Sequence, residues 1–193
     1  MASINRATLM TLEAYANARH EFRARVIAHK KARAVHLGDH VTLLFEDELT
    51  MRYQVQEMLR IERIFEAEAI DDELSSYNPL VPDGSNLKAT MLVEYEDAAE
   101  RKVALAAMKG IEDGVWIGVD GLGRVAAIAD EDMERENADK TSSVHFLRFE
   151  FTPAMIASLR RGAPMSVGVE HPYYRAQAVL DDAARAALVA DFA

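Results

Sequence analysis

The hydrophobic pattern changes its period once along this 193-residue chain, and that change constrains the fold more than any other feature. Up to about residue 70 the apolar residues recur at helical spacing, and from residue 87 they alternate as in strands. A polar stretch with two prolines and a glycine lies between, at residues 71–84. The pattern predicts an α+β fold, with a helical lobe over 1–84 that includes one short strand and a mostly antiparallel sheet lobe over 85–193. The two lobes can also form one compact domain.

Two long helices are expected in the first lobe. One begins at Thr8 or Thr11, either of which can cap it, and ends near residue 32. The other covers residues 49–70 and follows a strand that begins at His40. At about 100° per residue its apolar residues form one stripe, and Glu62 falls within about 20° of the centre of that stripe. A buried carboxylate needs a partner, a proton or a metal.

The first helix places unlike charge on its own apolar side, where Arg19 and Arg23 lie among apolar residues. We therefore predict that Arg23, or Arg19, pairs with Glu62 between the two helices. This pair is either a candidate catalytic or binding site or a structural ion pair that fixes the helix register. Neighbouring polar residues on the second helix are expected to be ordinary surface or margin residues: Gln54, Gln56 and Glu57.

The second lobe is expected to contain five strands and two helices. A hairpin is indicated by Asp120-Gly121, and Thr152 is expected to cap a helix over 153–161. The last helix covers 181–191. The acidic run that starts at Asp130 lacks the glycine and the final glutamate of a calcium loop, so it predicts a solvated acidic turn. The expected strands cover 87–95, 115–119, 125–128, 144–151 and 165–171.

Strand alternation sorts the histidines. It points His145 and His171 inward, and it places His40 on the same strand face as Glu46. Imidazole and carboxylate groups suit iron, zinc or manganese, so these four residues are candidate metal ligands. A catalytic role is considered for Glu62, Arg23 and His145. Because the spacings match no recognised motif, hydrogen-bonded structural histidines remain the alternative, and His20 and His29 are expected to be solvated.

Charge and composition bound the function classes. The net charge is −10, and residues 40–100 alone carry 15 acidic and 4 basic groups, whereas residues 1–39 carry 7 basic and 3 acidic groups. The acidic middle argues against binding to nucleic acids or anionic membranes. The chain has no cysteine, which excludes disulfides and an iron–sulfur cluster held by this chain alone. Without a signal peptide or a long apolar run, we expect a cytoplasmic protein.

Several segments resemble an uncharacterised bacterial family that is known only by a domain-of-unknown-function label. They are His40-Val-Thr-Leu-Leu-Phe-Glu-Asp, Tyr53-Gln-Val-Gln-Glu-Met, Tyr77-Asn-Pro-Leu-Val-Pro, Val144-His-Phe-Leu-Arg-Phe-Glu and Glu170-His-Pro-Tyr. The resemblance covers nearly the whole chain. Members of that family are often encoded beside rubrerythrin and a cysteine-rich iron–sulfur oxidoreductase, so the resemblance implies a peroxide-defence or electron-transfer context. It supplies no catalytic residues.

Two hypotheses follow. The first is an accessory or binding protein of a rubrerythrin and iron–sulfur redox system, with one of these proteins as its partner and no cofactor of its own. The second is a metal-dependent or acid–base enzyme that uses an inward site of His, Glu and Arg side chains. The sequence leaves the reaction, the ligand and the oligomeric state open.

Overall fold

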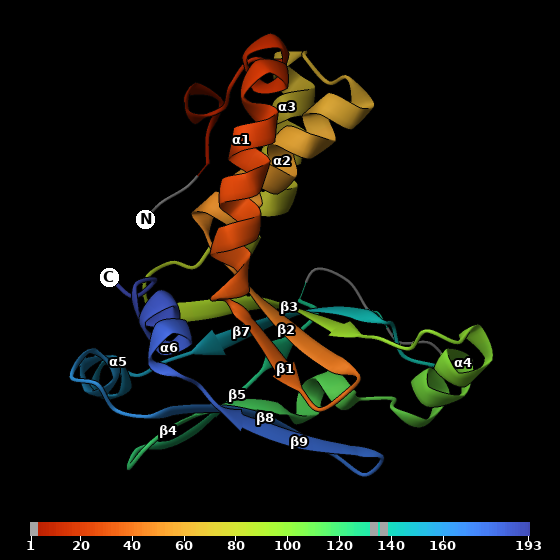
Figure 1. The fold of residues 1–193 in the computed structure, drawn as a ribbon, viewed down its shortest axis with the longest axis vertical. Helices are drawn as coiled ribbons and strands as arrows, with labels where there is room; N and C mark the ends of the chain where they lie inside the picture. The colour runs from red at the N-terminus through yellow and green to blue at the C-terminus, as the bar shows by residue number, and fades with distance from the viewer. Residues whose placement is uncertain (1–3, 132–134, 136–138) are drawn as a thin grey trace.

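The structure is a computed structural model that describes residues 4–131, 135 and 139–193. It contains two antiparallel β-sheets, and three helices stand together on the side of the first sheet that faces away from the second (Figure 1). The expected α+β class is therefore confirmed, with its helical lobe and its antiparallel strands.

The first sheet, sheet A, has the strand order β1-β2-β3-β7-β6. In β3 and β7 buried residues alternate with half-buried ones, as expected for a sheet with one face on the core. Neither β1 nor the separate β6 was predicted, because both are too short to show a period. The strands of sheet A are β1 (Ala34–Leu37), β2 (Val41–Glu46), β3 (Asn86–Val93), β6 (Ile128–Ala129) and β7 (Val144–Glu150).

The second sheet, sheet B, has the order β5-β4-β8-β9, and all its neighbours are antiparallel. The predicted Asp120-Gly121 turn joins β4 to β5 and is confirmed. The expected strand over 125–128 is divided between the two sheets, and β9 was not predicted. The strands of sheet B are β4 (Val115–Val119), β5 (Gly123–Ala126), β8 (Met165–His171) and β9 (Tyr174–Val179).

One hydrophobic core fills the space between the inner faces of the two sheets. Leu43 and Phe149 contribute from sheet A, and Ile117 and Val167 from sheet B, and each of them is fully buried. Burying one such side chain completely stabilises the fold by about 1.5–3 kcal/mol. The alternating residues that the sequence marks as apolar therefore hold the two sheets face to face.

The first long helix, α1 (Leu12–Lys31), begins where the sequence predicts, because the Thr11 side chain accepts a hydrogen bond from the Ala14 N–H. The second does not run to residue 70. It is divided into α2 (Glu48–Glu62) and α3 (Ala67–Tyr77). Arg63, at φ 56°, caps α2 in the left-handed conformation, and the Ile64 N–H reaches back to the Leu59 carbonyl. Glycine usually marks such an end, and here an arginine takes its place.

The remaining helices lie around the sheets. The helix α4 (Ala98–Ala107), which was not predicted, lies at one end of the sheets, and α5 (Pro153–Arg160) and α6 (Asp182–Val189) lie at the other (Figure 1). Thr152 caps α5 as expected, and α5 and α6 confirm the two helices that the sequence predicts in the second lobe. Short 3-10 helices complete the fold: η1 (Arg6–Thr8), η2 (Asn78–Leu80) and η3 (Ile111–Gly114).

The chain passes between the lobes at three junctions. It enters sheet A from α1, leaves from β2 into α2 and returns through η2 to β3. Residues 34–46 thus lie N-terminal to the expected lobe boundary at residue 84, yet β2 is hydrogen bonded to β3 along its whole length. The helical lobe is formed by α1, α2 and α3, and both strands of this segment belong to sheet A.

Candidate functional site

The candidate site is built around His145 on β7. Alternation predicts that this residue faces inward, and its side chain is fully buried. An imidazole at such a depth needs partners for both ring nitrogens. Three other segments supply them, since Asp130 follows β6, Glu112 lies in η3, and Thr141 precedes β7.

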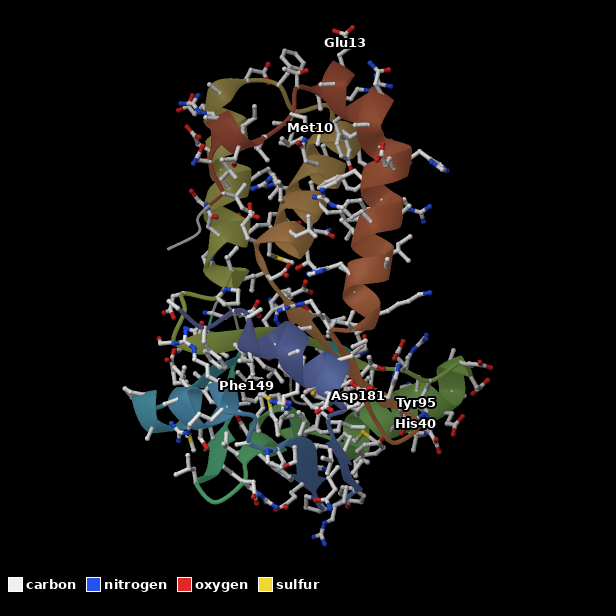
Figure 2. All side chains as sticks on the ribbon, turned by 60° about the vertical axis from the view of Figure 1, so that its left-hand side comes forward. Met10, Glu13, His40, Tyr95, Phe149 and Asp181 are labelled. Carbon is white, nitrogen blue, oxygen red and sulfur yellow. The ribbon has the colours of Figure 1, made fainter. Side chains whose placement is uncertain are left out.

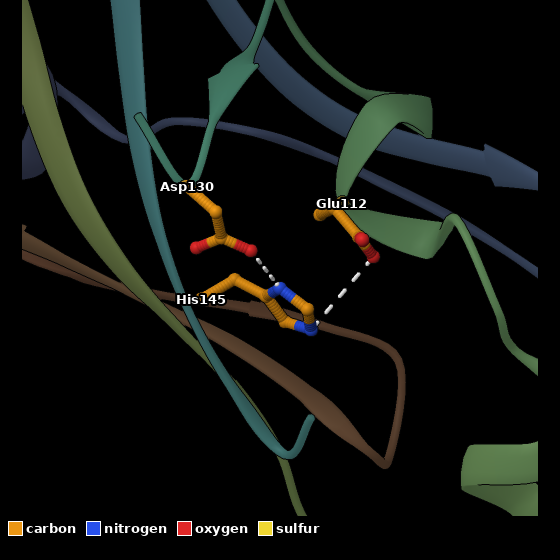
Figure 3. A group of neighbouring side chains, drawn as sticks. All are labelled: Glu112, Asp130 and His145. Carbon is orange, nitrogen blue, oxygen red and sulfur yellow. Dashed lines mark hydrogen bonds and ion pairs between the residues drawn. The ribbon is translucent and has the colours of Figure 1, made fainter. Parts of the chain in front are cut away.

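Figure 3 shows the imidazole between two carboxylates. Asp130 Oδ2 lies 2.5 Å from His145 Nδ1. On the other side of the ring, Glu112 Oε2 lies 3.7 Å from Nε2. The Thr141 hydroxyl and the Ser142 carbonyl oxygen are each 3.1 Å from the same nitrogen. A carboxylate on Nδ1 holds the ring so that Nε2 points at Glu112, which is how carboxylates orient metal-binding histidines.

Asp130 is held in place by its backbone as well as by its side chain. Its φ of 47° is rare for a residue other than glycine. The Asp130 N–H donates to the Phe146 carbonyl, and the Phe146 N–H donates to Asp130 Oδ1 at 2.9 Å. The prediction of a solvated acidic turn is therefore wrong for Asp130, whose side chain is only 10% exposed and also pairs with Arg135. Asp132 and Glu134 of the same run lie outside the described residues.

Three atoms of the site form a compact triangle. Its corners are His145 Nε2, Thr141 Oγ1 and Glu112 Oε2, and its sides measure 3.1, 3.4 and 3.7 Å. A triangle with these sides has a circumscribed radius of about 2.0 Å, which matches the usual distance of zinc from nitrogen and oxygen ligands. Without a metal, two hydrogen bonds can join the same three atoms. The His145 Nε2–H would donate to the Thr141 hydroxyl, and the Thr141 hydroxyl would donate to Glu112.

The predicted pair of Glu62 and Arg23 is wrong. Both residues are exposed, because α2 ends at Glu62 and the helical period that placed this residue on an apolar stripe stops there. The ion pair between the two helices lies closer to the middle of the lobe. Glu57 accepts two hydrogen bonds from Arg19, at 2.7 and 2.8 Å, and a third from the hydroxyl of the buried Tyr15 at 2.6 Å.

The Arg19 guanidinium lowers the pKa of Glu57 to about 2, against the opposing effect of burial. In the opposite sense, burial and the Glu57 carboxylate raise the pKa of the Tyr15 hydroxyl. A second residue predicted to lie at the surface, Gln56, is fully buried and holds both the N–H and the carbonyl of Met10. The helical stripe therefore identified the two facing helices but assigned the polar contacts to the wrong turn.

His40, Glu46 and His171 do not join His145. His40 stacks on Tyr95 with ring centroids 3.9 Å apart (Figure 2), and its Nδ1 contacts the Glu94 carbonyl. Glu46 lies at the other end of β2, where it accepts a hydrogen bond from Thr90. His171 belongs to sheet B and contacts the backbone of Lys109 and Tyr173. Of the four candidate ligands, only His145 lies in a cluster of ligand side chains among the described residues.

Sequence reasoning missed a second buried polar group, the Arg33 cluster, which consists of Arg33, Asp47, His29 and Asp191. Arg33 is 2% exposed and donates to the carbonyls of Phe45, Glu46 and Ala187. Its guanidinium also pairs with Asp191, and with Asp47 at 3.5 Å. Arg33 follows a basic helix end and so carries no sequence signal of burial. His29, expected in solvent, contacts Asp47 at 2.5 Å.

The carboxyl groups of the Arg33 cluster respond differently to burial. Burial opposes ionisation of Asp47, but Arg33, the Thr50 N–H and His29 outweigh it and lower the pKa of this carboxyl. For Asp191 burial prevails over Arg33, and the pKa is raised. The cluster joins the end of α1, the start of α2 and the end of α6, so it ties the helical lobe to the sheets.

These features define the class of protein: an α+β protein with two packed antiparallel sheets, a helical lobe and a buried Asp-His-Glu cluster. The chain belongs to the family described as "Protein of unknown function (DUF3501)", whose model matches residues 3–192. It is similar to a novel protein of unknown function from Burkholderia pseudomallei K96243, known from a crystal structure at 1.90 Å resolution. The two chains are 55% identical, each is covered completely, and the TM-score is 0.94. No curated protein matches this chain.

The described residues contain no helix that is both long and apolar enough to cross a membrane.

The expected membership of an uncharacterised family is confirmed by the family model. The expected redox context and the expected partners stay predictions, since the related protein is also one of unknown function.

Proposed function

We propose that this protein binds a divalent transition metal ion between His145, Glu112 and Thr141, and that Asp130 orients His145. The observation that carries the proposal is the triangle of ligand atoms, in which one point lies about 2.0 Å from all three. The donor set of one imidazole, one carboxylate and one hydroxyl suits iron, zinc or manganese. This proposal develops the hypothesis of an inward His and Glu site, with partners of His145 that the sequence did not indicate.

Burial defines the kind of metal site that we propose. His145 and Thr141 are at most 1% exposed, and the Glu112 side chain is 11% exposed. A metal at this position would hold β7 to η3, because its ligands His145 and Glu112 come from these two segments. We therefore infer a metal that stabilises the fold and is itself shielded from water.

Metal analysis of protein purified without an affinity tag tests the proposal. We expect about one iron, zinc or manganese ion per chain after growth with all three metals. His145→Gln and Glu112→Gln should remove it, and Asp130→Asn should weaken binding about 10–100-fold. His171→Gln is the matched control, because its imidazole hydrogen bonds only to backbone atoms among the described residues. A parent protein that stays metal-free, and whose Tm does not rise on titration with any of the three, would refute the proposal.

The family resemblance supports a second proposal, an accessory role in a rubrerythrin and iron–sulfur redox system. The chain has no cysteine, so a partner or the proposed metal would have to carry any electrons. Acidic residues of the segment 40–100 are exposed on α3 and around the start of α4, where they can contact a basic partner: Glu68, Asp72, Glu96 and Glu100. Screening by salt should weaken that contact.

Purification from the native host at low salt tests this role. We expect rubrerythrin or the iron–sulfur oxidoreductase to accompany the protein and to be released as salt is raised. If neither is recovered while the protein itself is monodisperse, the accessory role is refuted. The metal proposal is unaffected by that outcome.

A further inference from the structure

The outer face of sheet B carries the only tryptophan of the chain. Val115, Ile117 and Val119 of β4 face the core, so Trp116 between them faces outward. Within the part of the chain that the structure describes, no helix covers this face of sheet B (Figure 1). Antiparallel sheets usually carry polar side chains on a solvated face, whereas this one carries an aromatic ring. We call the outward residues Trp116, Arg124, Glu170, Arg175 and Gln177 the Trp116 face.

Two glycines form the floor on which the indole lies. A Cβ at Gly168 would lie 2.3 Å from Cζ2 of Trp116, and one at Gly118 would lie 3.3 Å from Cζ3. The ring therefore lies against the backbone of β8, the neighbouring strand, in which Gly168 pairs with Trp116. Glycine inside a strand weakens the strand and often marks a place where another group approaches the backbone closely. Here that close approach keeps the tryptophan flat on the sheet.

A flat group already covers the other face of the ring. The Arg124 guanidinium lies 3.6 Å from the centre of the Trp116 ring and donates to Glu170 at 2.7 Å. The side chains of Arg124 and Glu170 are 50% and 58% exposed, so their ion pair contributes little stability. The face of the Trp116 ring that points away from the sheet thus accepts a planar group at stacking distance. The Arg124 guanidinium that now lies there is held only by a weak ion pair.

The indole N–H of Trp116 has no acceptor within the described part of the chain. Trp116 is 7% exposed, and its Nε1 is buried without a hydrogen-bond partner among the described residues. Cζ3 lies toward Gly118, so the opposite edge, which carries Nε1, points toward the Glu170 side of the ring. A cavity of about 610 Å³ on that side is lined by Trp116, Glu170, Arg175 and Gln177, and one of about 430 Å³ lies on the Gly118 side. Both volumes fall in the range of small-molecule sites.

We propose that the Trp116 face binds a small aromatic carboxylate. Its ring stacks on Trp116 in place of the Arg124 guanidinium, and its carboxylate accepts hydrogen bonds from the Arg175 guanidinium. Two arginines, an indole N–H and the Gln177 amide face two carboxylates, Glu170 and Asp120, across the two cavities, so hydrogen-bond donors outnumber carboxylates. This imbalance favours an anion over a cation. The site is separate from the proposed metal site, and neither proposal depends on the other.

The single tryptophan makes the test direct, because all tryptophan fluorescence comes from this face. Benzoate, benzamide and benzamidinium share one ring and differ in charge. We expect benzoate to change the fluorescence saturably and to bind roughly tenfold more tightly than the other two, which is the size of effect that one charge-assisted hydrogen bond gives. In a proton–nitrogen correlation spectrum, the one indole N–H signal should shift with the same dissociation constant.

Arg175→Gln should weaken benzoate binding roughly tenfold. Arg161→Gln, an exposed arginine at the end of α5, is the matched control and should leave binding unchanged. Circular dichroism confirms that both variants are folded. The proposal is overturned if benzamidinium binds most tightly, if no compound gives a saturable change, or if Arg175→Gln and Arg161→Gln behave alike.

Discussion

Replacement of Arg33 by methionine probes the contact that ties the helical lobe to the sheets. The side chain is 2% exposed, donates to three backbone carbonyls and to Asp191, and forms an ion pair with Asp47. Methionine fills a similar volume but offers no donor. Asp191, whose side chain is 9% exposed, would then be a buried charge without its main partner.

Breaking a buried ion pair from one side costs about 3–5 kcal/mol. For a chain of this length, about 2–4 °C of Tm corresponds to each kcal/mol, so Arg33→Met should lower Tm by about 6–20 °C. Arg185→Met on α6 is the matched control. Arg185 pairs with Asp182, whose side chain is 98% exposed, and loss of such a surface pair costs about 1 kcal/mol or less.

The cost of Arg33→Met should also depend on pH. Burial raises the pKa of Asp191 in the folded state, and Arg33 limits that rise. A raised carboxyl pKa means that stability is lost as pH increases through the interval between the unfolded and folded values. Without Arg33 the folded pKa is higher still, so the loss extends to higher pH. The difference in unfolding free energy from the parent should therefore be larger at pH 7 than at pH 5.

Urea denaturation of the parent, Arg33→Met and Arg185→Met at both pH values measures these differences. Adding Asp191→Asn to Arg33→Met should restore part of the stability at pH 7, because it removes the unpaired charge. The reasoning is refuted if Arg33→Met costs no more than Arg185→Met, or if its cost is the same at both pH values.

Further outcomes follow from the other polar contacts and from the close packing of sheet B. Tyr15→Phe removes a hydrogen bond to a carboxylate and should cost about 1.5–3 kcal/mol in urea denaturation, and an unchanged midpoint would contradict that role. Because the pKa of Glu57 is lowered from 4.5 to about 2, its contribution is present above pH 4.5 and lost as pH falls toward 2. Glu57→Gln should therefore flatten the acid side of the stability curve, and an unaltered slope would count against it. Gly168→Ala should displace Trp116, with which its Cβ would overlap, and shift the tryptophan emission, and an unchanged emission spectrum would contradict this close packing.

Local patterns were sufficient for much of the fold. Strand alternation placed His145 and His171 in the interior, because a period of two fixes which face of a sheet a residue occupies. Thr152 marked the start of α5, and Thr8 or Thr11 the start of α1, because capping depends on neighbours within one turn. The α+β class followed from the change of period near residue 84.

Tertiary structure alone decided the sites. Glu112, Asp130 and Thr141 reach His145 from separate segments, and no spacing along the chain records which strand neighbours which. Arg63 adopts the left-handed conformation and ends α2. The helical geometry that had placed Glu62 among apolar residues therefore stops at this point. Arg33 is buried and Glu57 half-buried through contacts 158 and 38 residues away, and pairing at that distance is set by how the elements pack and not by local sequence.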